Sequence, residues 1–238
     1  MHLGAALVEL WQTWLDAIFP PRCAGCNRLG YHFCPACRRA VRPLPAPLCE
    51  SCGRPVAAGQ VCCPDCRTAR LPLAGVRSAG TFEGPLRTAI HRLKYRGRRG
   101  AARTLGHLLV APAQSLGLPR AAPAPVVVPV PLHAQRQRER GYNQAALLAR
   151  PLAERLGLAY EPALLRRVKA TPSQVGLDRR RRRENVRGAF VATGSLAGRH
   201  VLLVDDLATT GSTLASAAQA CLDAGAAAVY AVTLAREI

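Results

Sequence analysis

The residues with the plainest chemistry are eight cysteines spaced as four Cys-x-x-Cys pairs. They are Cys23, Cys26, Cys34, Cys37, Cys49, Cys52, Cys63 and Cys66. A Cys-x-x-Cys turn brings two thiolates to adjacent corners of a tetrahedron, and structural Zn²⁺ takes four such ligands. The short spacers favour sequential pairing, with the first four cysteines at one site and the last four at another, over an interleaved cross-brace. The sequence therefore predicts one or two structural zinc ions.

The remaining two cysteines need separate explanations. Cys62 lies beside Cys63 and could replace it as a ligand. Cys221 falls in a predicted helix, where a cysteine is usually a small buried hydrophobic residue. A module this small has almost no apolar core, so metal binding would supply the free energy of its folding. A purely structural module and one that also binds a partner are equally compatible with this pattern.

A second chemical signal is an apolar strand that ends in two acids and continues into a loop of small hydroxyl residues. The loop and the start of the following helix comprise Ala208, Thr209, Thr210, Gly211, Ser212 and Thr213. Backbone N–H groups at such a turn and at a helix N-terminus converge on one point, and the hydroxyls add donors. This segment predicts a site for a phosphate monoester.

Asp205 and Asp206 stand before that loop, at the carboxyl end of the strand, where ligands bind in open α/β sheets. Two carboxylates fit a phosphate carried by a sugar, whose hydroxyl protons they accept or whose Mg²⁺ they hold. The alternative is a helix-capping loop with incidental acids. We expect both carboxylates to be exposed, so that replacing both by Asn weakens ligand binding with little effect on folding.

Alternating strands and helices from about residue 72 predict an α/β domain with a mostly parallel sheet flanked by helices. The predicted division is an amphipathic N-terminal helix in residues 1–20, a cysteine-rich zinc module in 21–70 and the α/β domain in 71–238. Predicted strands are 76–82, 126–130, 188–192, 200–204 and 226–234. Predicted helices are 3–19, 85–95, 101–109, 143–156 with a kink at Pro151, and 212–224, whereas residues 111–125 form a loop.

The chain is strongly basic, and the charge is unevenly placed. Its 33 basic and 14 acidic residues give a net charge of +19. Residues 1–70 carry +4, residues 71–200 carry +18 and residues 201–238 carry −3. Such a distribution favours a polyanionic partner, or a phosphate ligand with its metal ion. An arginine-rich codon bias is the alternative.

Several segments together resemble one known family. The run from Val201 to Leu214, VLLVDDLATTGSTL, resembles the phosphoribosyl-diphosphate motif of type I phosphoribosyltransferases. Residues 91–97, 126–132 and 140–144 and the cysteine module resemble the ComF family, competence-associated proteins with a double zinc ribbon before a phosphoribosyltransferase domain. The resemblance implies a type I phosphoribosyltransferase fold, a site for phosphoribosyl diphosphate with Mg²⁺, and a role in DNA uptake during natural transformation.

The resemblance also implies where a pyrophosphate group would bind. The turn Pro131–Ala134, which includes Leu132, is similar to the family's pyrophosphate loop, and Arg136, Arg138 and Arg140 follow it. A mobile lid would carry Gln174 and the arginines from Arg179 to Arg183. Arginine suits these roles because its planar fork bridges two phosphate oxygens.

Arginines could equally bind DNA phosphates without sequence preference. The candidates are Arg92, Lys94, Arg96, Arg98, Arg99, Arg180, Arg181 and Arg182. Tyr95 or Tyr142 could stack a base. No general acid or base for an acceptor is evident. The first hypothesis is therefore a phosphoribosyl-diphosphate-binding protein that handles incoming single-stranded DNA, and the second is an active Mg-dependent transferase acting on a nucleobase or amine. A purely regulatory nucleotide-binding protein is a third.

No run reaches the roughly 20 apolar residues of a transmembrane segment, and Glu9 and Asp16 interrupt the apolar N-terminus. These features predict a cytoplasmic protein, with a peripheral place at the inner membrane left open. The N-terminal helix is expected to pack on the neighbouring module. Its alternative is to anchor the chain to a membrane or to a partner such as a DNA-translocation helicase or other competence machinery.

Overall fold

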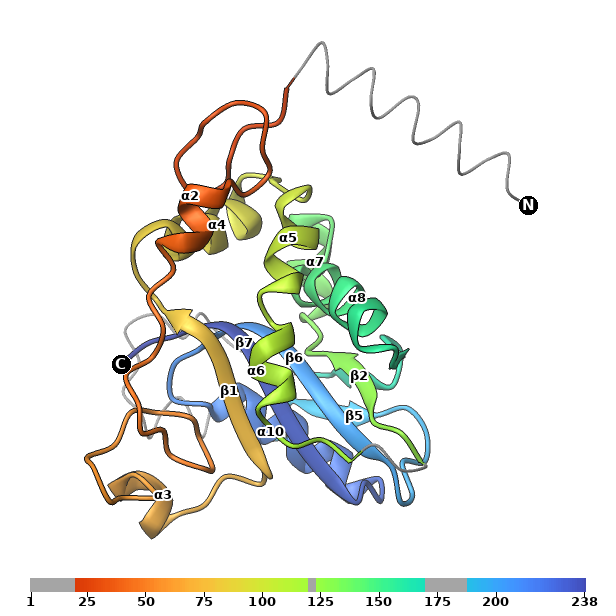
Figure 1. Ribbon diagram of the computed structural model, residues 1–238. Coiled ribbons are helices and arrows are strands. Elements are labelled where there is room, and N and C mark those ends of the chain that lie inside the picture. The colour runs from red at the N-terminus through yellow and green to blue at the C-terminus, as the bar shows by residue number, and fades with distance from the viewer. Residues whose placement is uncertain (1–19, 120–122, 170–187) are drawn as a thin grey trace.

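The computed structural model describes residues 20–119, 123–169 and 188–238, and its centre is a five-stranded parallel sheet (Figure 1). The strand order is β1-β7-β6-β2-β3. The strands are β1 (Gly75–Thr81), β2 (Val126–Pro129), β3 (Ala159–Tyr160), β6 (His200–Ala208) and β7 (Ala228–Arg236). Two short strands, β4 (Leu165–Arg167) and β5 (Phe190–Ala192), form a separate antiparallel pair. The predicted α/β class with a parallel sheet is confirmed.

Alternation along the central strands divides the core into two layers. On β6, Leu202 and Val204 face one apolar cluster, whereas Val201 and Leu203 face another. Successive side chains of a strand point to opposite faces, so apolar residues at consecutive positions bury both faces. The first face is covered by α4 (Gly84–Tyr95), α5 (Ala101–His107), α6 (Val110–Gln114) and α8 (Gln144–Leu156) (Figure 1). The second face is covered by α10 (Ser212–Asp223) and the β4–β5 pair.

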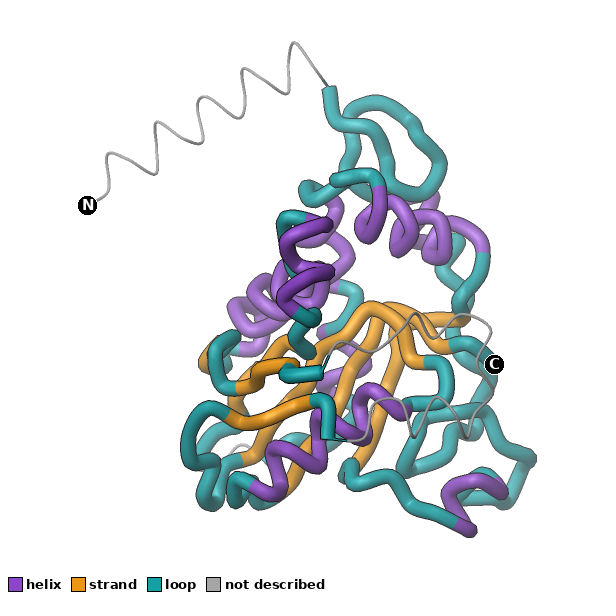
Figure 2. The backbone as a smooth tube through the Cα atoms, turned by 180° about the vertical axis from the view of Figure 1, so that it is seen from behind, coloured by secondary structure: helices purple, strands orange, loops and turns teal. Residues whose placement is uncertain are grey.

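The cysteine-rich part forms two similar ribbons that pack on different parts of the sheet domain. Each contains one short helix, α2 (Pro35–Arg39) or α3 (Pro64–Thr68). Figures 1 and 2 show the first ribbon against α4 and the second beside the start of β1. Cys23 and Phe33 belong to the same apolar cluster as Leu86 of α4. The first ribbon therefore shares the core of the sheet domain.

Some element boundaries differ from the sequence predictions. Strand β6 continues past Val204 to Ala208, because β7 pairs with it along this stretch, with Asp205 opposite Thr233. Helix α6 occupies part of the segment predicted as a loop, and α7 (Ala134–Arg140), β3 and β4 were not predicted. Tertiary pairing and packing override weak local preferences in such short elements. Pro151 lies inside α8, as expected.

Two predictions concern residues that the structure does not describe. The N-terminal helix 3–19 and the lid candidates, from Gln174 through Arg179 to Arg183, lie outside the described residues. Within the described ranges, none of the helices combines the length and the apolar character that crossing a bilayer requires.

Candidate functional site

Both cysteine tetrads have the geometry of a tetrahedral zinc site. Within each tetrad the four Sγ atoms lie within 4.8 Å of one another. The Sγ atoms of Cys23 and Cys37 are 3.7 Å apart and those of Cys26 and Cys34 are 3.6 Å apart. Four sulfurs bonded to one zinc at about 2.3 Å would lie about 3.8 Å apart, so the observed cavities fit the ion. The cysteines are grouped as the predicted sequential pairing requires, and both groups fit a structural zinc ion.

Local backbone structure prepares these thiols for the metal. Cys34 precedes the first turn of α2 at Pro35, and its N–H donates to the Cys23 Sγ at 3.3 Å. Burial raises the pKa of the Cys23 thiol, but the backbone N–H groups around it outweigh burial and lower the pKa to about 6. The same balance lowers the pKa of Cys49 to about 6. Cys62 is buried outside the second tetrad, so Cys63 is the ligand.

The loop predicted to hold a phosphate joins β6 to α10. Gly211 adopts φ 79°, a left-handed conformation that favours glycine. It is the N-cap residue of α10, which begins at Ser212. The Thr210 hydroxyl lies 2.7 Å from the Ser212 hydroxyl and accepts the Ser212 N–H at 3.3 Å. The first turn of a twelve-residue helix thus follows a tight loop bearing several hydroxyls, which is the arrangement that binds anions.

The two acids before this loop have different environments. Asp206 is only 2% exposed and receives the Lys94 ammonium at 2.5 Å and the Gln144 amide at 3.0 Å. Burial raises the pKa of Asp206, but Lys94 outweighs it and the pKa is lowered. The expectation of two exposed carboxylates was therefore wrong for Asp206. The reason is that β6 continues beyond it and the end of α4 covers it.

Asp205 remains half-buried, and the ion pairs among the described residues do not include it. Its Oδ1 accepts the N–H of Asp206 at 2.8 Å. Burial and the neighbouring charge of Asp206 raise the pKa of Asp205 to about 8, although Lys94 opposes them. Of the two acids, Asp205 is therefore the better placed to accept a hydrogen bond from a hydroxyl group of a ligand.

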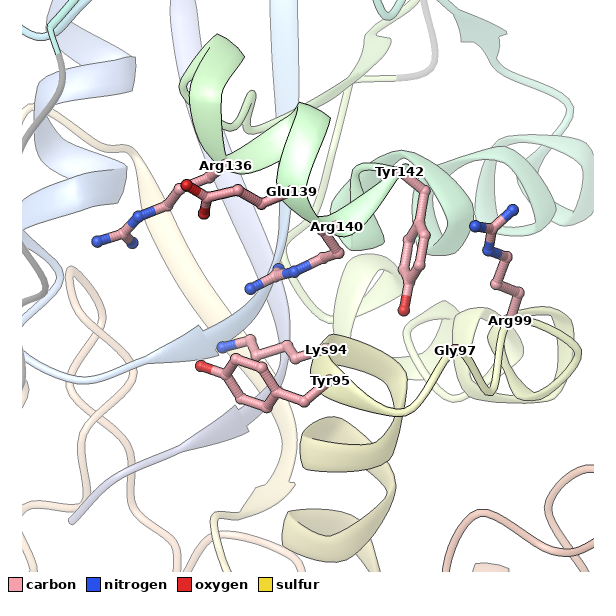
Figure 3. A pocket seen from close by; sticks show the side chains of 8 residues that line it. All are labelled: Lys94, Tyr95, Gly97, Arg99, Arg136, Glu139, Arg140 and Tyr142. Atoms are coloured by element: carbon pink, nitrogen blue, oxygen red, sulfur yellow. The ribbon is translucent and has the colours of Figure 1, made fainter.

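A basic cavity of about 470 Å³ adjoins this acid pair through Lys94 (Figure 3). It lies between the end of α4 and helix α7, and it is lined by Lys94, Tyr95, Gly97, Arg99, Arg136, Glu139, Arg140 and Tyr142. The Arg140 guanidinium lies 5.3 Å from the Tyr95 ring centre, and that of Arg99 lies 4.4 Å from the Tyr142 ring centre. One cavity therefore unites residues predicted separately for pyrophosphate and for DNA.

The segment 140–144 links this cavity to the acids. The Arg140 guanidinium donates to the Gln144 side-chain oxygen, whose amide nitrogen holds Asp206. The Tyr142 hydroxyl donates to the Leu93 carbonyl. Asn143 caps α8 by accepting the Ala145 N–H at 3.0 Å. Together these bonds join α7 to α8, and the segment between the two helices to α4 and β6.

Two of the residues predicted to bind DNA form contacts inside the protein instead. Arg92 donates to the carbonyls of Cys23, Ala24 and Gly25 at 3.0, 3.2 and 3.4 Å, so it binds the first ribbon. Together with the Lys94–Asp206 pair, this contact removes both residues from the predicted DNA surface.

Arg96 and Arg99 are exposed and Arg98 is half-exposed, as a DNA surface requires. Arg138 is exposed but does not line the cavity, and Pro131 and Leu132 are half-buried next to the end of β2.

Sequence reasoning missed that the Lys94 ammonium and the Gln144 amide hold Asp206. It also missed that the Arg236 guanidinium donates to the carbonyl of Cys52 inside the fold. One signal was present for Lys94, since the chain has only two lysines among its 33 basic residues. A compact ammonium at a buried position is a different requirement from a surface arginine. For Gln144 and Arg236 no comparable signal exists.

The structure is that of a phosphoribosyltransferase-like domain joined to a double zinc ribbon. The first is indicated by the parallel sheet, in which a strand ends in two aspartates before the predicted phosphate loop, and the second by the two cysteine tetrads that precede the sheet. Two family models match in the same order. The "Double zinc ribbon domain" matches residues 14–67 and the "Phosphoribosyl transferase domain" matches residues 143–238.

Relatives along nearly the whole chain identify the family. The chain is 36% identical over 209 residues to "DNA utilization protein YhgH" of Salmonella typhi, which covers 86% of this chain and 90% of that protein. It is 31% identical to "Competence protein F" of Haemophilus influenzae, with 76% of this chain and 80% of that protein covered. It is also 31% identical to "Competence protein ComFC" of Bacillus subtilis, with 85% and 83% covered. The chain belongs to the ComF family.

Proposed function

We propose that the protein binds phosphoribosyl diphosphate at the end of β6 and handles single-stranded DNA during DNA uptake. The observation that carries the first part is the loop Thr209–Thr213, which follows a half-buried Asp205 at the carboxyl edge of the sheet. The loop N–H groups and hydroxyls suit the 5′-phosphate. Asp205 suits a ribose hydroxyl, and the fully paired Asp206 fixes the position of Asp205.

The basic cavity supports a place for the diphosphate group. Arg136 and Arg140 line it together with Lys94, and Lys94 also touches Asp206. Planar guanidinium groups bridge two phosphate oxygens, as a diphosphate requires. Mg²⁺ would accompany the ligand and neutralise part of its charge. The arginines would then hold the leaving group's end of the ligand while the loop holds the other end.

Two observations support the DNA part of the proposal. The segment 71–200 carries +18, and Arg96, Arg98 and Arg99 remain at the surface in the described part of that segment. The relatives named above include a DNA utilization protein and two competence proteins. A surface that binds DNA phosphates without sequence preference, next to a ligand site, fits a protein whose affinity for single-stranded DNA depends on bound phosphoribosyl diphosphate.

Calorimetric titration tests this proposal directly. The purified protein is titrated with phosphoribosyl diphosphate plus Mg²⁺, with and without a single-stranded oligonucleotide. We expect micromolar binding, roughly −8 kcal/mol, and an affinity that changes when DNA is present. The variant Arg138→Gln is the control and should bind phosphoribosyl diphosphate as the parent protein does, because Arg138 is exposed and lies outside the cavity. No heat of binding in the parent protein would refute the ligand site, and unchanged affinity with DNA would refute the coupling.

A second candidate function is phosphoribosyl transfer to a nucleobase or amine. It is favoured by the acid pair before the loop and by the basic cavity, which adjoins the pair through Lys94. No side chain among the described residues has the placement of a general base for an acceptor. Release of pyrophosphate in the presence of Mg²⁺ and a panel of bases, nucleosides and amines would establish transfer, and no release across the panel would leave binding as the function.

A further inference from the structure

The second zinc ribbon lies directly against the proposed phosphate loop. A small cavity of about 20 Å³ is bordered by both, with Cys52, Cys66 and Leu71 on the ribbon side and Thr210 on the loop side. The Leu71 side chain lies close beside the loop: it lines this cavity together with Thr210, and a Cβ atom added to Gly211 would come within 3.3 Å of its Cδ1. Leu71 also packs against the cysteine cluster itself. The metal-bearing side chains and the loop are therefore separated by one side chain.

Arg236 forms a second connection between the ribbon and the loop. It ends β7 opposite Ala208, the residue that immediately precedes the loop. Its side chain is 1% exposed, and its guanidinium donates to the carbonyl of Cys52. A buried cation is costly unless an anion lies beside it. Zn²⁺ with four thiolates carries a net charge of −2 and would supply that anion.

The first zinc ribbon has no corresponding contact in the described part of the chain. Its cysteines pack against Leu86 of α4, and Arg92 of the same helix holds its backbone. The two ribbons thus have the same chemistry but different neighbours. This difference gives an internal comparison for any effect of zinc on the loop.

We propose that zinc in the second cysteine tetrad controls the order of the phosphate loop and, through it, the affinity for a phosphate monoester ligand. Loss of the ion would free the four cysteine side chains, so that Leu71 and Arg236 would lose the fixed surface on which they rest. The loop residues would then have to be ordered again when the ligand binds. This proposal rests on the function proposed above for the loop.

A matched pair of variants tests the proposal. Cys37 and Cys66 occupy equivalent positions, each at the third residue of its short helix and each in one tetrad. We expect Cys37→Ser and Cys66→Ser each to lose about one zinc ion per chain, as four-ligand structural sites require. Only Cys66→Ser should speed amide hydrogen exchange in peptides covering 209–213. Its Kd for phosphoribosyl diphosphate should rise about tenfold for each loop residue that loses its order.

A further variant covers the case in which Cys66→Ser does not fold. Leu71→Ala leaves all eight ligands in place, so it should keep both zinc ions while exchange in 209–213 and the Kd both increase. Exchange in the core strand, residues 201–204, reports whether the fold is intact. Equal loop exchange in the Cys66→Ser, Cys37→Ser and parent proteins, or an unaltered loop in Leu71→Ala, would overturn the proposal. Absence of ligand binding in the parent refutes only the proposed function, because loop exchange is measured without ligand.

Discussion

Replacement of Lys94 by Met tests the electrostatic core of the candidate site. The Lys94 ammonium lies 2.5 Å from a carboxylate oxygen of Asp206, which is 2% exposed. Met keeps the apolar stem but removes the charge, and Asp206 is left with the Gln144 amide. Breaking a buried ion pair from one side costs about 3–5 kcal/mol. Because the Lys94 side chain is 20% exposed, we expect the lower end, a loss of about 3 kcal/mol in the free energy of unfolding.

The loss should depend on pH in a definite direction. In the parent protein Lys94 outweighs burial and lowers the pKa of Asp206. Asp206 therefore stabilises the fold above its unfolded pKa of about 3.9, and this stabilisation disappears as the pH falls through the folded-state pKa. Without Lys94, burial raises the pKa of Asp206, so that the penalty grows as the pH rises above about 4. The difference between variant and parent should be larger at about pH 8 than at about pH 5.

Urea denaturation followed by circular dichroism, with zinc kept at saturation, measures this difference at both pH values. Arg96→Met is the control, because Arg96 is exposed nearby on the same segment and its change should stay within about 0.5 kcal/mol. The double variant Lys94→Met with Asp206→Asn should recover part of the loss, since a neutral amide needs no counter-charge. A loss below about 1 kcal/mol that is equal at both pH values would refute the reasoning.

Four further measurements test the same structure. The pKa of Asp205 is raised to about 8, so its carboxylate form predominates only above that pH. The affinity for phosphoribosyl diphosphate, measured by calorimetry, should therefore rise as the pH increases through about 8 in the parent protein. In Asp205→Asn the affinity should not change over this pH range. A carboxyl whose folded pKa is raised also destabilises the fold as the pH rises from its unfolded to its folded pKa, so Asp205→Asn should unfold at higher urea than the parent at about pH 8, and equal midpoints would contradict this. Metal analysis should find about two zinc ions per parent chain and about one in Cys49→Ser, and full zinc content in the variant would refute the ligand assignment. Replacing Arg96, Arg98 and Arg99 together by Gln should reduce the slope of log affinity for single-stranded DNA against log salt by about 2; an unchanged slope would exclude these residues from the DNA surface.

The sequence could reveal the parts of this protein whose local pattern carries the information. Four Cys-x-x-Cys pairs indicate a metal-binding module whose short spacers favour the sequential pairing that the structure has, and the apolar run of β6 followed by Thr209–Thr213 identifies both a strand and a loop. The environment of Asp206 could not be read in this way. It depends on Lys94 and Gln144, which lie 112 and 62 positions earlier in the chain and meet Asp206 only through the packing of α4 and α8 on the sheet. Short elements such as β3 exist only because a neighbouring strand pairs with them.

The placement of the two ribbons gives the long cysteine-rich segment a common role at the candidate site. Arg92 of α4 donates hydrogen bonds to the backbone of the first ribbon, and Lys94, two positions later, forms the ion pair with Asp206. The second ribbon borders the loop at a small cavity that Leu71 and Thr210 both line. Each ribbon therefore supports one half of the candidate site, the acid pair or the phosphate loop. Because structural zinc sites contribute folding free energy outright, zinc ions in the two tetrads would stabilise both halves of the candidate site, which an α/β domain alone would have to order with short loops.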